Sequence, residues 1–94
     1  MIIVRSGFIA KPGQAGKLAA QLKNMAKAGN LRNVRALTDL AEDFNHVIME
    51  HEVASAAEFK DLMTRYSSDP QAREATKRYT HLWTTGRREL FRLA

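Results

Sequence analysis

The chain of 94 residues contains no cysteine, only two prolines and no long apolar run. The lack of cysteine excludes disulfides, thiolate metal sites and cysteine nucleophiles. No stretch approaches the roughly 18 consecutive apolar residues of a membrane-spanning helix. The first ten residues also lack the basic start and long apolar core of a signal peptide. From these absences we expect a cytoplasmic protein with no membrane partner.

The usual sequence signatures of nucleotide binding and nucleophilic catalysis are also missing. The segment KPGQAGKL at residues 11–18 resembles a phosphate-binding loop, but that motif needs glycine at Lys11 and a hydroxyl at Leu18. Pro12 and Gly13 instead fit a tight turn before a helix. No Ser-His-Asp, G-x-S-x-G or glycine-rich dinucleotide pattern is present. The sequence therefore predicts no cofactor.

The net charge of +5 raises the question of a polyanionic partner. Lysine and arginine occur mostly singly along the chain, and several have acidic neighbours at helical spacing. Nucleic-acid-binding proteins usually gather these residues on one face. The distribution therefore argues against nucleic-acid binding.

Strand and helix patterns alternate along the first half of the chain. Apolar β-branched residues predict a central strand over residues 2–10, and alternation predicts two more over 33–41 and 46–53. A turn is expected at residues 42–45. Residues 14–28 carry apolar side chains at helical spacing, and Gly29-Asn30 suits the end of this helix.

A second helix and a last strand are predicted in the second half. Ser55 and Glu58 form a capping-box signature, and Asp69-Pro70 interrupts and restarts the helix. Its second segment is expected to place Tyr79 and Trp83 on a buried stripe and to end at Gly86. The last strand is expected over residues 87–94.

The resulting order, β-α-β-β-α-β, predicts a single α+β domain over residues 1–94 with a ferredoxin-like fold. Both helices should cover one face of a four-stranded antiparallel sheet. The first strand nevertheless offers Val4 and Phe8 on one side and Ile3 and Ile9 on the other. Two helices can bury only one of these sets, and large exposed apolar patches mark interaction surfaces. We therefore expect a homodimer through the uncovered sheet face.

Three segments resemble the dimeric α/β-barrel superfamily. FIAKPGQ and VIMEHEVASAAEF are similar to antibiotic-biosynthesis-monooxygenase-type members, and YSSDPQAREATKRYTHLWTTGRRELFRL is similar to NIPSNAP-like members. The resemblance implies two sheets packed around an interior cavity. Haem-degrading members use an asparagine, a tryptophan and a histidine where this chain has Ser6, Arg65 and Ala75, which argues against haem degradation. The superfamily hosts very different activities, so its fold does not specify a function.

Arg5, Glu50 and His51 are the candidate catalytic residues. Arg5 and Glu50 are mid-strand on strands that neighbour each other in this fold, and a buried charge needs a partner. They could form a structural ion pair, a contact across the dimer, or a cavity-lining pair in which Glu50 or His51 accepts a proton. Alternation places Glu50 and His51 on opposite faces of their strand.

Candidate ligand-binding residues are Phe8, Met49, Tyr79 and Trp83, although the aromatic pair near residue 80 also suits core packing. Arg87 and Arg88 could bind an anion at the barrel mouth or complement a helix dipole. Histidines and glutamates crowd residues 46–52, but their spacing is a weak signal, and we predict no metal site.

The sequence thus predicts a homodimer that binds a small apolar molecule between sheet and helices, without an evident catalytic constellation. The alternative is a cofactor-independent monooxygenase or isomerase-like enzyme acting on small aromatic or polyketide-like compounds.

Overall fold

The predicted element order is confirmed, with the second helix divided at Asp69-Pro70 as expected. The computed structural model describes residues 1–39 and 45–94. Its elements are β1 (Ile2–Ala10), α1 (Ala15–Ala28), β2 (Arg32–Thr38), β3 (His46–Val53), α2 (Ala56–Ser68), α3 (Pro70–Thr76), the short 3-10 helix η1 (Tyr79–Leu82) and β4 (Trp83–Arg92). The predicted turn at 42–45 falls mostly outside the described residues, as do the last two residues of the strand expected at 33–41.

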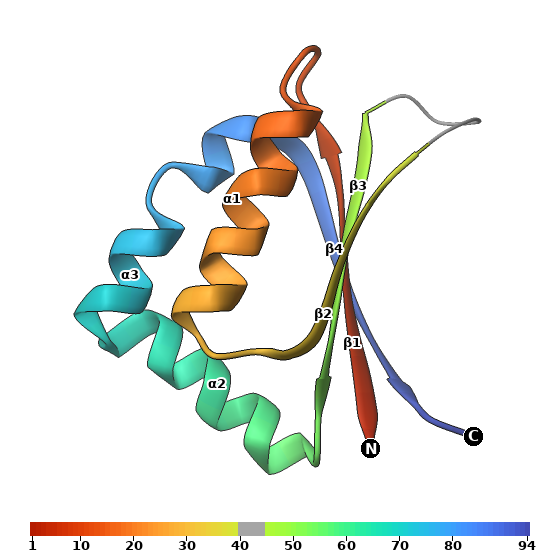
Figure 1. Ribbon diagram of the computed structural model, residues 1–94, viewed down its shortest axis with the longest axis vertical. Coiled ribbons are helices and arrows are strands. Elements are labelled where there is room, and N and C mark those ends of the chain that lie inside the picture. The colour runs from red at the N-terminus through yellow and green to blue at the C-terminus, as the bar shows by residue number, and fades with distance from the viewer. Residues whose placement is uncertain (40–44) are drawn as a thin grey trace.

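The four strands form one antiparallel sheet in the order β2-β3-β1-β4. All helices lie on one side of the sheet, and the opposite side is left uncovered by the described residues (Figure 1). We call these sides the helix face and the open face. Alternation along β1 turns Val4 and Phe8 to the helix face, where they are buried. Ile3 and Ile9 point to the open face and are only partly buried.

The core under the helices has two parts. One groups Phe8 with residues of α1 and β3, including Leu18, Leu22 and Val47. The other groups Val4 and Val53 of the sheet with Leu62 of α2. The amphipathic periods of both helices produce this arrangement, because each turns one apolar stripe to the sheet.

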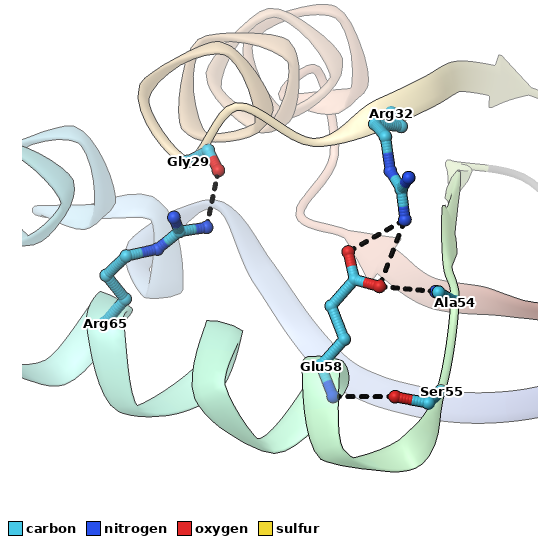
Figure 2. A network of polar contacts seen from close by, with 6 residues as sticks. All are labelled: Gly29, Arg32, Ala54, Ser55, Glu58 and Arg65. Carbon is cyan, nitrogen blue, oxygen red and sulfur yellow. Dashed lines mark hydrogen bonds and ion pairs between the residues drawn. The ribbon is translucent and has the colours of Figure 1, made fainter.

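A polar network fixes the start of α2 against the start of β2 (Figure 2). Ser55 caps the helix, and its hydroxyl accepts a hydrogen bond of 3.2 Å from the Glu58 amide. The Glu58 carboxylate accepts from the Ala54 amide at 2.6 Å and from Arg32 at 2.8 and 3.0 Å. The predicted cap is confirmed, and it also joins two segments far apart in the sequence.

The prediction for residues 77–86 was wrong in detail. α3 ends at Thr76, Arg78 takes a left-handed conformation with φ of 66°, and only the short 3-10 helix η1 follows before the strand. Trp83, expected on the helix, is the first residue of β4. Gly86 does not end a helix: it lies within β4, where a Cβ would come within 3.2 Å of the Phe8 ring and 3.1 Å of Trp83. A larger residue at this position would therefore have to displace one of the two aromatic rings by a few tenths of an ångström.

Within residues 1–39 and 45–94, no helix is long and apolar enough to span a bilayer.

Candidate functional site

A cavity of about 290 Å³ lies between the helix face and the helices. It lies between the two parts of the core. On β1, the small residue Ser6 borders the cavity, while its neighbours on the same face, Val4 and Phe8, belong to the two parts of the core. Its apolar lining comes from both layers: Met25, Leu31, Met49, Met63, Tyr66 and Tyr79. Methionine side chains adapt to occupants of varied shape and contact aromatic rings favourably.

His51 contributes a buried, titratable side chain to this cavity. It sits in β3 on the helix face and is only 3% exposed. Its Nδ1 is enclosed and has no hydrogen-bond partner among the described residues. Burial lowers the pKa of His51, and the positive charge of Arg88 lowers it further, against an opposing effect of the Glu52 backbone. The imidazole is therefore neutral at pH 7.

Arg88 brings a positive charge to the edge of the same cavity. It lies on the edge strand β4, directly opposite Ser6 of β1. Its Nε donates a long hydrogen bond of 3.5 Å to the Ser6 hydroxyl, and its guanidinium carbon is 5.8 Å from the ring centroid of Phe59 in α2. Arg88 is exposed to solvent, so the charge stands at the opening of the cavity rather than in its interior.

The predicted pair of Arg5 and Glu50 is present, but on the open face. The two residues face each other in the register of β1 and β3, and Arg5 Nε donates to Glu50 Oε2 at 2.7 Å. A second arginine, Arg35 of β2, donates to Glu50 Oε1 at 2.6 Å. These two hydrogen bonds, Arg35 first, outweigh burial and lower the pKa of the Glu50 carboxyl. The sheet thus separates Arg5 and Glu50 from His51 and from the cavity.

The predicted ligand-binding residues divide into two groups. Met49 and Tyr79 line the cavity. Phe8 and Trp83 do not; they pack behind Tyr79, with ring centroids 6.2 Å and 6.0 Å from it. Of the two arginines considered for anion binding, Arg88 reaches the cavity and Arg87 points to the open face.

The sequence patterns gave no sign that Ser6, Arg35 or most of the α1 and α2 lining belong to a site. The helical spacing of Met25 and Met63 indicated that their side chains face the sheet, but not that they line a cavity. Alternation does not predict the pairing of Arg35 with Glu50, because β2 is irregular. Arg32 lies opposite Glu52 and Arg35 opposite Glu50, so an advance of three residues along β2 matches two residues along β3. Among the described residues, no group of three histidine, aspartate or glutamate side chains could hold a metal ion.

Comparisons with known proteins identify the fold. No family model matches the chain, and no curated protein sequence matches it. An uncharacterised NIPSNAP domain protein from Burkholderia xenovorans superposes with a TM-score of 0.84 at 13% identity, over 100% of this chain and 95% of that one. A NIPSNAP family protein from Agrobacterium tumefaciens superposes with a TM-score of 0.82 at 11% identity, over 99% of this chain and 92% of that one.

An antibiotic-biosynthesis-monooxygenase-like protein from Chloroflexus aurantiacus has the same fold, with a TM-score of 0.78 at 16% identity over 99% of this chain and 92% of that one. The expected likeness to these two groups is therefore confirmed at the level of the fold. Identities this low carry no activity from one protein to another.

Proposed function

We propose that the protein binds a small, mainly apolar molecule in the cavity between its sheet and its helices. The observation that carries this proposal is a space of about 290 Å³ lined by three methionines, two tyrosines and a leucine, with the buried side chain of His51 in its wall. Ligand pockets combine such an apolar lining with few polar groups and start near this size. The volume suits an occupant of one or two rings.

Naphthalene is a suitable first probe, because it has two rings and no polar group. Wild-type protein should bind it, as measured by the fluorescence of the naphthalene ring. Met63→Trp should fill the cavity from α2 and abolish binding. Ala20→Trp adds the same indole to an exposed position of α1 and should leave binding unchanged. Absence of binding to the wild-type protein, or equal binding to Met63→Trp, would contradict the proposal.

We further propose that two copies pack through their open faces. Support comes from the apolar side chains left on this face, of which Leu37, Phe91 and Leu93 are 41%, 43% and 61% exposed. Arginines and glutamates are interspersed among these apolar side chains, so a second copy of the same face can supply partners for both kinds of charge. A stable dimer would shelter a surface that a monomer leaves in water.

Sedimentation equilibrium should then give twice the chain mass of 10.6 kDa. Ile48→Lys places a charge in the middle of the open face and should produce monomers. Ala20→Lys, on the exposed side of α1, should not. A wild-type monomer at all concentrations would refute the dimer, whatever the cavity binds.

A cofactor-independent monooxygenase or isomerase-like activity on small aromatic or polyketide-like compounds is the second candidate. The neutral His51 beside an apolar cavity supports it, because such chemistry needs a group that takes a proton from the substrate. Of the three candidate catalytic residues, only His51 borders the cavity. Turnover should be lost in His51→Gln and kept in Glu50→Gln. The reverse result would move the chemistry to the open face.

A further inference from the structure

We propose that the molecule bound in this cavity is a small ring-bearing carboxylic acid, whose carboxylate accepts hydrogen bonds from His51 and from Arg88 at the opening. This inference rests on the proposed function, since it concerns the occupant of the same cavity. It names the polar group of that occupant, which the apolar lining alone leaves open.

Among the described residues that line the cavity, no side chain carries a negative charge, and Arg88 carries a positive one. Three of the hydroxyls are already used as donors within the fold. Those of Tyr66, Ser67 and Thr76 donate to backbone carbonyls at 2.6, 2.8 and 2.8 Å. Burial also raises the pKa of Tyr66, which keeps its proton in place. The polar groups that remain for an occupant are those of Ser6, His51, Tyr79 and Arg88.

His51 presents a hydrogen-bond donor to the cavity. The ring is neutral because burial lowers its pKa, so it carries one N–H and one acceptor nitrogen. Its Nδ1 is enclosed and has no partner among the described residues, and a buried N–H without an acceptor is rare and costly. The proton therefore lies on Nε2, the nitrogen that is open to an occupant. His51 thus favours a ligand that brings an acceptor oxygen.

Arg88 brings a positive charge that no acidic side chain of residues 1–39 and 45–94 neutralises. Its Nε reaches the Ser6 hydroxyl of the neighbouring strand at 3.5 Å, and its guanidinium carbon lies 5.8 Å from the centroid of the Phe59 ring. Both contacts hold the side chain at the cavity, but neither partner carries a negative charge. An anionic ligand would supply the missing charge.

The donors of His51 and Arg88 approach the same part of the sheet. Ser6, which Arg88 reaches, is opposite Met49 in the register of β1 and β3, so His51 is its diagonal neighbour on the helix face. Such diagonal neighbours are about 7–8 Å apart, within reach of long side chains. The positive charge of Arg88 also contributes to the lowered pKa of His51, which requires the two groups to be near each other. One ligand group can therefore meet both donors.

A carboxylate suits this pair of donors. It brings acceptor oxygens without a donor, and its two oxygens can accept from both residues at once. Its hydrogen bond to a guanidinium is charge-assisted, whereas a ketone or an ester would leave the charge of Arg88 unpaired, and an ammonium group would be repelled. Because Arg88 is exposed, the carboxylate would lie near the opening, where water lowers the cost of desolvation. The ring would occupy the methionine-lined interior.

Four probes of one ring system test this inference: naphthalene, methyl 2-naphthoate, 2-naphthoate and 2-naphthylmethylammonium. At neutral pH, 2-naphthoate should bind to the wild-type protein about tenfold more tightly than its methyl ester, because only the ionised acid pairs with the charge of Arg88. The ester should in turn bind more tightly than naphthalene, since its carbonyl oxygen accepts from His51. The ammonium probe should bind most weakly. Fluorescence titration of each probe gives the dissociation constants.

Two variants with matched controls assign these gains to residues. Arg88→Gln should remove the preference for 2-naphthoate over its ester. Arg87→Gln lowers the net charge equally but lies on the open face, so it should preserve that preference unless anions are attracted by the basic chain as a whole. His51→Phe keeps a ring of similar size and should remove the gain from naphthalene to the ester. His46→Phe, on the open side of the same strand, should preserve that gain. Circular dichroism confirms that each variant is folded.

The outcomes separate the two proposals. If naphthalene binds but 2-naphthoate binds no more tightly than its ester, the cavity binds apolar molecules and the carboxylate inference is wrong. The same holds if the preference for 2-naphthoate survives in Arg88→Gln, or is lost equally in Arg87→Gln. If none of the four probes binds to wild-type protein, the proposed function fails, and the inference that rests on it fails as well.

Discussion

Glu50→Gln tests the ion cluster on the open face. The carboxylate of Glu50, only 7% exposed as a side chain, accepts hydrogen bonds from Arg5 at 2.7 Å and from Arg35 at 2.6 Å. Glutamine has the same shape but no charge, and its single oxygen can accept from only one arginine at full strength. The variant therefore loses the attraction between one anion and two cations with little change in packing.

The expected loss of stability depends on how deeply the two arginine partners of Glu50 are buried. A hydrogen bond to a charged group contributes about 1.5–3 kcal/mol when buried. The arginine side chains are 43% and 69% exposed, so water screens both pairs, and exposed pairs contribute about 0.2–1 kcal/mol. We expect a total loss of about 2 kcal/mol in the free energy of unfolding. For a domain of this size, that corresponds to a fall of roughly 10 °C in melting temperature.

The effect should depend on pH with a definite sign. The pKa of the Glu50 carboxyl is lowered in the folded state, so the unfolded chain takes up this proton first as pH falls. The stabilisation is fully present above the unfolded value near 4.5 and is lost as pH falls through the folded value. The difference between wild type and Glu50→Gln should therefore be constant near neutral pH and shrink below pH 4.5.

Urea unfolding at one fixed protein concentration measures these differences. Glu52→Gln is the control, because Glu52 lies on the same strand and face but has no ion pair among residues 1–39 and 45–94. It should change stability by less than about 0.5 kcal/mol. Equal stability of the two variants at pH 7, or a Glu50→Gln deficit that persists unchanged in acid, would refute the reasoning.

Three further substitutions probe stability elsewhere. Gly29→Ala should lower the free energy of unfolding by about 2 kcal/mol, measured by thermal unfolding, because a Cβ there collides with the Tyr66 hydroxyl and lies 2.7 Å from its Cζ. Gly16→Ala is the control and should not lower it, because the space around Gly16 is open. Asp69→Ala removes the N-cap of α3, whose carboxylate accepts a hydrogen bond from the Gln71 amide at 2.9 Å, and should lower the free energy of unfolding by about 1 kcal/mol. A loss of stability no larger than that of Asp61→Ala would contradict this capping role. The lowered pKa of His51 means that the unfolded chain binds its proton first, so stability should decline as pH falls from 7 to 5, and less steeply in His51→Phe.

Local patterns in the sequence were sufficient to predict most of the elements. The apolar β-branched residues of 2–10 and the alternation of residues 46–53 predicted β1 and β3 with their bounds, and the alternation placed Glu50 and His51 on opposite faces. Ser55 and Asp69 marked the two helix starts, because a cap depends on residues only two or three positions away. Apolar residues on both faces of the first strand also indicated that the helices would leave one face uncovered.

Only the tertiary structure decided which residues meet. Trp83 was predicted on a helical stripe and Gly86 at the end of that helix, but pairing with β1 and the left-handed turn at Arg78 placed both in a strand. Arg35 joined Glu50 through an irregular register that alternation cannot predict.

The cavity, too, depends on distant partners. Ser6 became part of it because residues of β1, β3, α1 and α2, far apart in the sequence, line one space. Helical and strand periods are properties of neighbouring residues, whereas cross-strand partners and enclosed volume arise only when separate segments pack together.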